Sequence, residues 1–334
     1  MKTMKTIVYK LPQIKTKDTA IDVVYDEVKP SKLIKYGFNQ TADDLNIIEL
    51  TSDPHYRAGL NFDLDRSASR KFTMAQTHAE FWEVFLSFDL LSSNQSIQTS
   101  HPDIVEDVIK IYGDKIKSLT KITVNKSKKN NNLVIYKYSD IELDESISVQ
   151  LILKDLPELL GSQTTGSNMV IQLFSLQTKP TIDLIYYITS NYQSVYLFKP
   201  NITSNLSSSC YLVCTNLLKN VNFPKVNDKG YVTNILDKSV KIPVSFTTCI
   251  QCYNSEIIPQ KIITYNKIKS YLDSKVYEGL TYQEMISSQD ENFSIWTEKY
   301  IEHYKDVPKY LSEGLDRTNK KCDYLEKLNN LFIE

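Results

Sequence analysis

The side chains of this chain that could take part in chemistry lie at the ends of apolar runs typical of strands. Asp140 follows the run 133–138, Gln172 lies within the run 168–174, and Ser209 precedes a further run of this kind. A positioned base contributes about 10²–10⁴-fold to the rate of a proton transfer. A glutamine amide cannot accept a proton, and a serine hydroxyl cannot supply the charge of a carboxylate. Gln172 and Ser209 therefore cannot supply general acid–base chemistry, whereas Asp140 could.

Residues 168–215 follow the order strand, helix, strand, polar loop, strand. This order resembles the C-terminal half of the FtsJ-like RNA ribose 2′-O-methyltransferases, which include cap methyltransferases, and the resemblance spans about residues 95–218. That family carries a strand ending in Lys-Leu-Phe, a strand ending in Phe-Lys-Pro, and a Ser-Glu-Arg-Tyr stretch before its last strand. Here Phe198-Lys199-Pro200 is kept, but Gln172 replaces the first lysine and the last stretch reads Ser208-Ser209-Cys210-Tyr211.

The resemblance implies that the family's Lys-Asp-Lys-Glu tetrad survives only in part. Its chemistry needs a lysine, held by neighbouring acids, that removes the ribose 2′ proton. Asp140 matches the tetrad aspartate, the alternative being a loop carboxylate that ends a strand, and Lys71 is the only nearby candidate for the first lysine. We interpret Asp140, Gln172 and Ser209 as remnant positions and expect no catalytic residues.

A second departure from the family concerns the loop that approaches S-adenosylmethionine. The family has Pro-Gly-Gly-Phe there, whereas this chain reads His101-Pro102-Asp103-Ile104. Asp103 adds a negative charge and Ile104 a β-branched side chain where glycine would let the backbone approach a ligand. The resemblance therefore implies a remnant loop and no bound cofactor. The pattern alone predicts a helix start, with Ser100 as a candidate cap, Pro102 near the first turn and Asp103 at the positive end of the helix dipole.

Composition favours a protein partner over nucleic acid. The chain has 334 residues, of which 41% are apolar and 24% charged, as in ordinary globular proteins. The formal net charge of −1 lacks the basic excess with which proteins usually grip phosphates. We expect RNA contact to be weak or indirect. No GxGxxG or P-loop pattern occurs, and only 8 residues are glycine.

The candidate metal ligands are five cysteines and four histidines. Cys249 and Cys252 have the spacing of a zinc or redox motif, and Cys210 with Cys214 could complete four ligands. The latter two flank an expected strand, which puts them about 13 Å apart, too far to share one ion. The histidines are scattered. We therefore expect no metal, and interpret the cysteines as buried strand residues.

Alternating helices and strands predict an α/β fold with a largely parallel sheet. We expect an FtsJ-like, Rossmann-like methyltransferase core at 71–222, an N-terminal extension at 1–70 and a mostly helical C-terminal region at 223–334. Within that region, residues 240–252 read as a strand and 261–334 as helices. No apolar run suits a signal peptide or a membrane span, so the cytoplasm is the expected compartment.

Short matches also resemble the catalytically silent, methyltransferase-like small subunits of poxvirus mRNA capping enzymes. They lie at residues 181–185 and 196–198, with a weaker one at 35–37. Our leading hypothesis is a non-catalytic subunit, or pseudoenzyme, that binds and stimulates a viral capping or cap-methylating enzyme at a cytoplasmic replication site. The tyrosine-rich C-terminal region, with Trp296, is the expected partner surface.

Two other classes of function stay open. The first is an active S-adenosylmethionine-dependent RNA 2′-O-methyltransferase with displaced catalytic residues. The second is a structural or interaction protein unrelated to capping.

Overall fold

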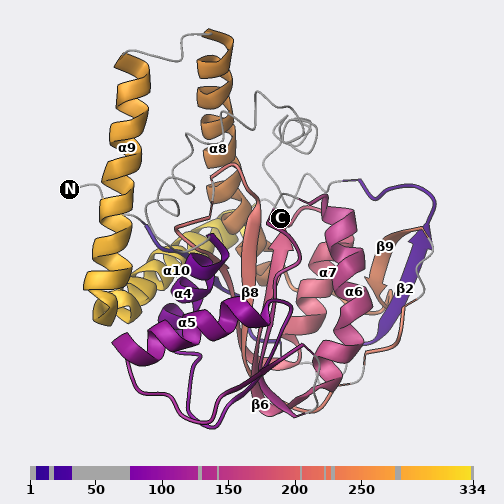
Figure 1. Ribbon diagram of the computed structural model, residues 1–334. Helices are drawn as coiled ribbons and strands as arrows, with labels where there is room; N and C mark the ends of the chain where they lie inside the picture. Colours follow the sequence, from indigo (N-terminus) through magenta and orange to yellow (C-terminus); the bar gives the residue numbers. More distant parts are fainter. Residues whose placement is uncertain are drawn as a thin grey trace.

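The computed structural model describes residues 5–14, 19–31, 76–126, 130–140, 143–203, 205–221, 223–226, 230–274 and 280–331. Its centre is a seven-stranded sheet with helices on both faces (Figure 1). This confirms the expected α/β fold class. The expected domain boundaries, at 70/71 and 222/223, involve residues outside the described ranges, as do Lys71 and the short match at 35–37.

The sheet has the strand order β1-β7-β8-β6-β5-β3-β4 and is largely parallel, as expected. Strands β6 and β7 are both antiparallel to β8, and are therefore parallel to each other and to β3, β4 and β5. Strand β1 is antiparallel to β7. The bounds are β1 (Ile7–Lys10), β3 (Ser96–Thr99), β4 (Thr123–Asn125), β5 (Asn131–Tyr136), β6 (Gln163–Phe174), β7 (Tyr192–Lys199) and β8 (Ser209–Leu217). The carboxyl ends of the parallel strands and the start of β8 consequently meet at the same end of the sheet, where ligands of such sheets usually bind.

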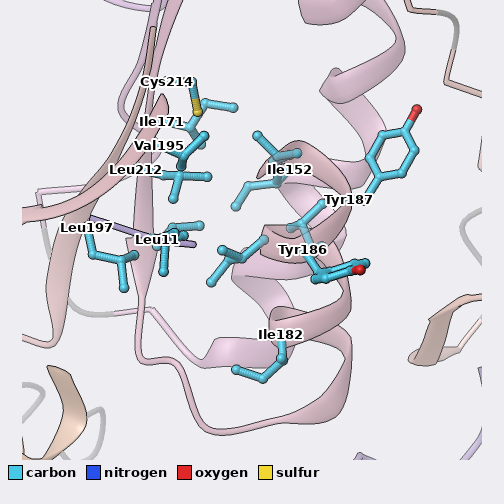
Figure 2. Close-up of a cluster of buried hydrophobic side chains, with 14 of the residues drawn as sticks. Leu11, Ile152, Ile171, Ile182, Tyr186, Tyr187, Val195, Leu197, Leu212 and Cys214 are labelled. Atoms are coloured by element: carbon cyan, nitrogen blue, oxygen red, sulfur yellow. The ribbon is translucent and has the colours of Figure 1, made fainter. Parts of the chain in front are cut away.

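Each face of the sheet is covered by its own pair of helices. α4 (Gln76–Phe88) and α5 (Pro102–Lys115) pack on one face, and α6 (Glu145–Gly161) and α7 (Lys179–Thr189) on the other. Successive side chains of a strand point to opposite faces, so Val134 joins the α6–α7 core while its neighbour Ile135 joins the α4–α5 core. Figure 2 shows Ile171 and Leu212 of the sheet directed toward Ile152 of α6.

The remaining elements form a small sheet and a set of C-terminal helices. β2 (Ile21–Asp26) pairs antiparallel with β9 (Tyr231–Leu236). The helices are α8 (Val244–Ser274), α9 (Leu280–Thr297), the π-helix η3 (Glu298–Glu302), the 3₁₀-helix η4 (Tyr304–Asp306) and α10 (Val307–Leu331). Helices α8 and α9 extend beyond the end of the sheet (Figure 1). No helix in the described part of the chain is long and apolar enough to span a membrane.

The expectation of a strand at residues 240–252 was wrong, because α8 begins at Val244. The β-branched residues of this stretch favour a strand locally. The buried residues Phe246, Ile250, Tyr253 and Ile257, however, recur at steps of four and three, the spacing of one helix face. Packing of that face outweighs local propensity.

The expectation that Trp296 lies on a partner surface was also wrong. Its side chain is buried, as are those of Tyr253 and Tyr300. A buried indole N–H needs an acceptor, and that of Trp296 donates to Glu83 Oε1 at 2.7 Å. Of the tyrosines in this region, Tyr324 is clearly exposed.

Helix α10 covers the outer edge of the main sheet at β1. Thr318 Oγ1 donates to the Val8 carbonyl at 2.8 Å, and Arg317 Nη2 donates to the Thr6 carbonyl at 2.9 Å. Gly314 makes this close approach feasible, since a Cβ there would lie 3.0 Å from the Thr6 carbonyl oxygen. The edge strand is therefore not open for pairing with another chain along these residues.

Two buried charged residues tie the C-terminal helices to the sheet. Glu83 of α4 accepts from Trp296 and from the backbone N–H groups of Asn201 and Ile202, at 2.7–2.8 Å. Burial outweighs these hydrogen bonds and raises the pKa of Glu83. Lys299 of η3 donates to Thr6 Oγ1 at 2.8 Å. Burial lowers the pKa of Lys299 from 10.5 to about 8, although Glu83 and Glu313 partly oppose the shift.

Lys299 should give the protein a distinctive pH dependence above neutrality. Between pH 8 and 10.5 the unfolded chain holds a proton that folded Lys299 has released, so this residue makes stability rise with pH. Relative to Lys299→Met, the unfolding free energy of the wild type should therefore increase by up to about 3 kcal/mol over this window. Urea unfolding of both proteins from pH 7 to 10 measures the difference. The exposed Lys309→Met is the matched control, and identical pH profiles for wild type and Lys299→Met would contradict the prediction.

Candidate functional site

Gln172 lies near the centre of the sheet, at the end where the parallel strands finish. It is on β6, almost fully buried, and every hydrogen-bonding position of its amide is used. Oε1 accepts from the backbone N–H groups of Tyr138 and Ser139 at 2.8 and 3.1 Å. Nε2 donates to the Ser139 carbonyl and to Ser209 Oγ, both at 2.9 Å. Two of the residues singled out in the sequence, Gln172 and Ser209, are thus in direct contact, and Gln172 clamps the loop that leads to the third, Asp140.

Lys137, which sequence reasoning did not single out, lies beside this loop with its ammonium group buried. Its Nζ lies 2.8 Å from Thr77 Oγ1, 2.8 Å from Glu80 Oε2 and 2.7 Å from Asp140 Oδ1. An ammonium group has three protons to donate, and each has an acceptor here. The ammonium group of Lys137 therefore lies between two carboxylates and a threonine hydroxyl.

Glu80 of α4 is the second site residue that sequence reasoning missed. Besides Lys137, its carboxylate accepts from the Tyr211 hydroxyl at 2.6 Å, from Gln76 Nε2 at 3.0 Å and from Thr203 Oγ1 at 3.3 Å. A signal was present in the sequence. Glu80 and Glu83 interrupt the apolar stretch of a helix that is buried almost all round, and carboxylates there need donors from neighbouring elements.

Asp140 closes this charged cluster on the solvent side, with about 70% of its side chain exposed. Partial burial opposes its ionisation, but hydrogen bonds from Lys137 and Thr77 outweigh that effect and lower the pKa of Asp140. Burial lowers the pKa of the neighbouring His101, with Asp140 acting in the opposite direction. Near neutral pH the cluster therefore holds an ionised Asp140 beside a neutral His101.

The expected remnant of the cofactor loop is the first turn of a helix. α5 begins at Pro102, only two residues after the end of β3 at Thr99. Asp103 is exposed, and Ile104 packs against the core beneath α4 and α5. Ser100 is not the cap of this helix. His101 occupies that position, while Ser100 Oγ accepts from the Lys137 N–H and donates to its carbonyl, both at 3.0 Å.

Lys199 of the Phe-Lys-Pro segment turns toward the loop that precedes β8. Its Nζ donates to the carbonyls of Ser207 and Ser209 at 2.8 and 3.4 Å. Lys261 of α8 reaches the same loop through Ser208 Oγ at 2.5 Å. Both lysine side chains are buried. These contacts fix the position of Ser209 next to Gln172.

No group of three or more His, Cys, Asp or Glu residues in the described ranges is placed to hold a metal ion. All five cysteines are free thiols. Cys210 and Cys214 lie on β8 as expected, but Cys249 and Cys252 lie on α8 rather than on a strand. Their different setting follows from the helical packing described above.

The sequence of this chain is similar to those of several known proteins. The chain is 28% identical over 100 residues to cap-specific mRNA (nucleoside-2′-O-)-methyltransferase 1 of Dictyostelium discoideum. The aligned segment covers 30% of this chain and 13% of that protein. It is 26% identical over 205 residues to the protein of the same name in Caenorhabditis elegans, covering 57% of this chain and 21% of that protein. The chain thus spans about a fifth or less of the length of these relatives. These similarities support a relationship to the FtsJ-like methyltransferase superfamily.

A relative of full length defines the family more closely. The chain is 35% identical over 350 aligned residues to the uncharacterized protein R383 of Acanthamoeba polyphaga mimivirus, covering 98% of this chain and all of that protein. This chain belongs to the same family as that giant-virus protein. No family model matches the sequence. Among solved structures, a putative ribosomal RNA methyltransferase from Plasmodium falciparum aligns with 43% of this chain at 14% identity and a TM-score of 0.33.

The Lys137–Glu80 pair should behave as one stabilising unit. Lys137→Met leaves the buried Glu80 carboxylate without its charged partner and should lower the unfolding free energy by about 3–5 kcal/mol. The double variant Lys137→Met/Glu80→Gln should lose less than the sum of the two single variants. Urea unfolding of the four proteins measures the coupling. Lys110→Met, on the exposed face of α5, should change stability by less than about 0.5 kcal/mol. Additive single effects would show that the two residues act independently.

Proposed function

We propose that this chain is a non-catalytic, methyltransferase-like subunit that binds and stimulates a viral mRNA capping or cap-methylating enzyme. The observation that carries this proposal is the state of Gln172 and its neighbours. Gln172 stands where the resemblance calls for a lysine base, and all four of its hydrogen-bonding positions are used for packing. The acidic partner of that base is replaced by the Ser209 hydroxyl.

The stretch after β3, where the family resemblance places the cofactor loop, supports the proposal that this chain does not bind S-adenosylmethionine. This stretch has no glycine, and α5 starts at Pro102, where a loop would need to open toward the ligand. Ser100 is engaged with the backbone of Lys137 on both its donor and acceptor sides. These features support the proposal that the chain does not bind S-adenosylmethionine.

Charge supports a role through a protein partner. With a formal net charge of −1, the chain has little long-range attraction for phosphate. Stimulation of an enzyme then requires that this subunit bind the active conformation of the catalytic subunit more tightly than the inactive one. The full-length relative in a giant virus is consistent with action at a viral replication site.

The cofactor part of the proposal is tested by titration. Isothermal titration of the full chain at about 100 µM should give no saturable heat with S-adenosylmethionine, and capped RNA should gain no 2′-O-methyl group. Gln172→Lys/Ser209→Glu should not rescue activity, because the stretch after β3 is unchanged. Micromolar binding or turnover by the wild type would refute the non-catalytic assignment.

The partner part needs a separate experiment. The full chain, tagged in its native infection setting, should co-purify with a capping-enzyme catalytic subunit, and the purified complex should show faster cap methylation than that subunit alone. Tight, strongly salt-dependent RNA binding by the isolated chain would instead place it among direct RNA binders. Recovery of virion structural proteins without a capping enzyme would favour the interaction protein unrelated to capping.

One observation favours the second candidate, an active RNA 2′-O-methyltransferase with displaced residues. Lys137 is held by Asp140 and Glu80, the kinds of residue that such a reaction uses. Its nearly complete burial argues against contact with a ribose. If Lys137 is a displaced base, the wild type transfers methyl groups, and Lys137→Met lowers that rate by about 10²-fold or more. Lys110→Met is the control, and no methyl transfer by the wild type dismisses this candidate.

A further inference from the structure

Three thiols from two separate helices converge beside strand β1. Cys249 and Cys252 lie one turn apart on α8, and Cys322 lies on α10, which packs against α8. The Cys322 thiol interacts with the thiols of both Cys249 and Cys252. The helices are also joined directly here, since Lys321 Nζ donates to the Cys252 carbonyl at 3.0 Å. The proposed function does not use these thiols.

The thiols differ in exposure and in their other contacts. Cys249 and Cys252 are buried, whereas Cys322 is partly open to solvent. The Cys249 thiol donates to the Lys10 carbonyl at 3.6 Å, so it is engaged with β1. Cys322 is the thiol that a small oxidant reaches first, and Cys252 is the neighbour whose thiol forms a hydrogen bond with the Cys322 thiol itself.

We propose that Cys322 and Cys252 form a reversible disulfide that locks α10 to α8. With hydrogen peroxide as the oxidant, the Cys322 thiolate attacks one peroxide oxygen, breaks the O–O bond and becomes a sulfenic acid, and hydroxide leaves. The Cys252 sulfur then attacks the Cys322 sulfur, forms the S–S bond and releases the sulfenic oxygen as water. Overall, two thiols and one peroxide give one disulfide and two waters. A dithiol reductant reverses the change by exchange.

The surroundings make this reaction slow near neutral pH. The hydrogen bond with Cys322, then burial, raises the pKa of the Cys252 thiol. The hydrogen bond with Cys249 is the largest cause that raises the pKa of Cys322. Because the thiolate is the reacting form, oxidation should become faster as pH rises. In a reducing compartment the pair stays as thiols, as is usual for intracellular proteins.

The disulfide would hold α10 in place over β1, the edge strand that α10 covers. The bond closes a loop of about 70 residues, which removes conformational freedom from the unfolded chain. Oxidation should therefore raise the melting temperature of the full chain by about 5 °C or more. It should leave the Arg317 and Thr318 contacts to β1 in place, since both thiols already belong to the packed helices.

Peptide mapping without reductant tests the proposal. The full chain is treated with hydrogen peroxide at pH 7 and pH 8.5, then digested and analysed by mass spectrometry. We expect a peptide pair joined through Cys252 and Cys322, formed several-fold faster at pH 8.5, and removed by dithiothreitol. The rise in melting temperature should be absent in Cys322→Ser and Cys252→Ser and present in Cys214→Ser, whose thiol lies on β8 outside the cluster.

The mapping decides the matter even if a serine variant fails to fold, because it uses the wild type. A bond between Cys249 and Cys322 would overturn the assignment of Cys252. Disulfides only between different molecules, or no disulfide after hours of treatment, would overturn the lock itself. A linked pair with no change in melting temperature would show that the bond does not constrain α10.

Discussion

The burial of two carboxylates, one turn apart on α4, is the constraint on which the rest of this structure depends. Glu80 and Glu83 are both almost fully buried, and an unpartnered carboxylate in such a place would cost several kcal/mol or more. Their donors come from the end of β5, from β8, from the segment after β7 and from α9. Helix α4 therefore holds these elements in one arrangement, and the C-terminal helices are part of the same packed unit.

The same constraint limits the chemistry that is possible at the end of the sheet where the parallel strands finish. A lysine that removes a proton must reach its substrate, yet the Lys137 side chain is almost fully buried and its ammonium group is paired with two carboxylates. Gln172 is equally committed, because its amide holds the backbone at Tyr138 and Ser139 in place. The polar side chains of Gln172 and Lys137 are thus engaged in the protein's own hydrogen bonds and ion pairs. This is the physical basis of the proposed non-catalytic role.

Several features of this arrangement were predictable and others were not. Strand and helix periodicity predicted the order of elements from β6 to β8, and matching to a known family predicted that Gln172 and Ser209 occupy related positions. They contact each other at 2.9 Å. The pair Lys137–Glu80 was not predicted, because its members are 57 residues apart. Carboxylates in an apolar helix indicate that donors are needed, but not which residues supply them. The start of α8 was misjudged because β-branched residues concealed a helical spacing that becomes decisive only when its face is buried.

The sequence by itself determined the α/β class, the largely parallel sheet and the types of side chain at the end where its parallel strands finish. These features follow from periodicity and residue identity. Tertiary structure alone decided which polar groups meet. It placed Trp296 inside the protein on Glu83, 213 residues away, rather than on a surface. It also brought Cys322 to Cys252. Such partners are selected by the packing of whole elements, because a buried donor or acceptor must find whatever complementary group the fold brings within reach.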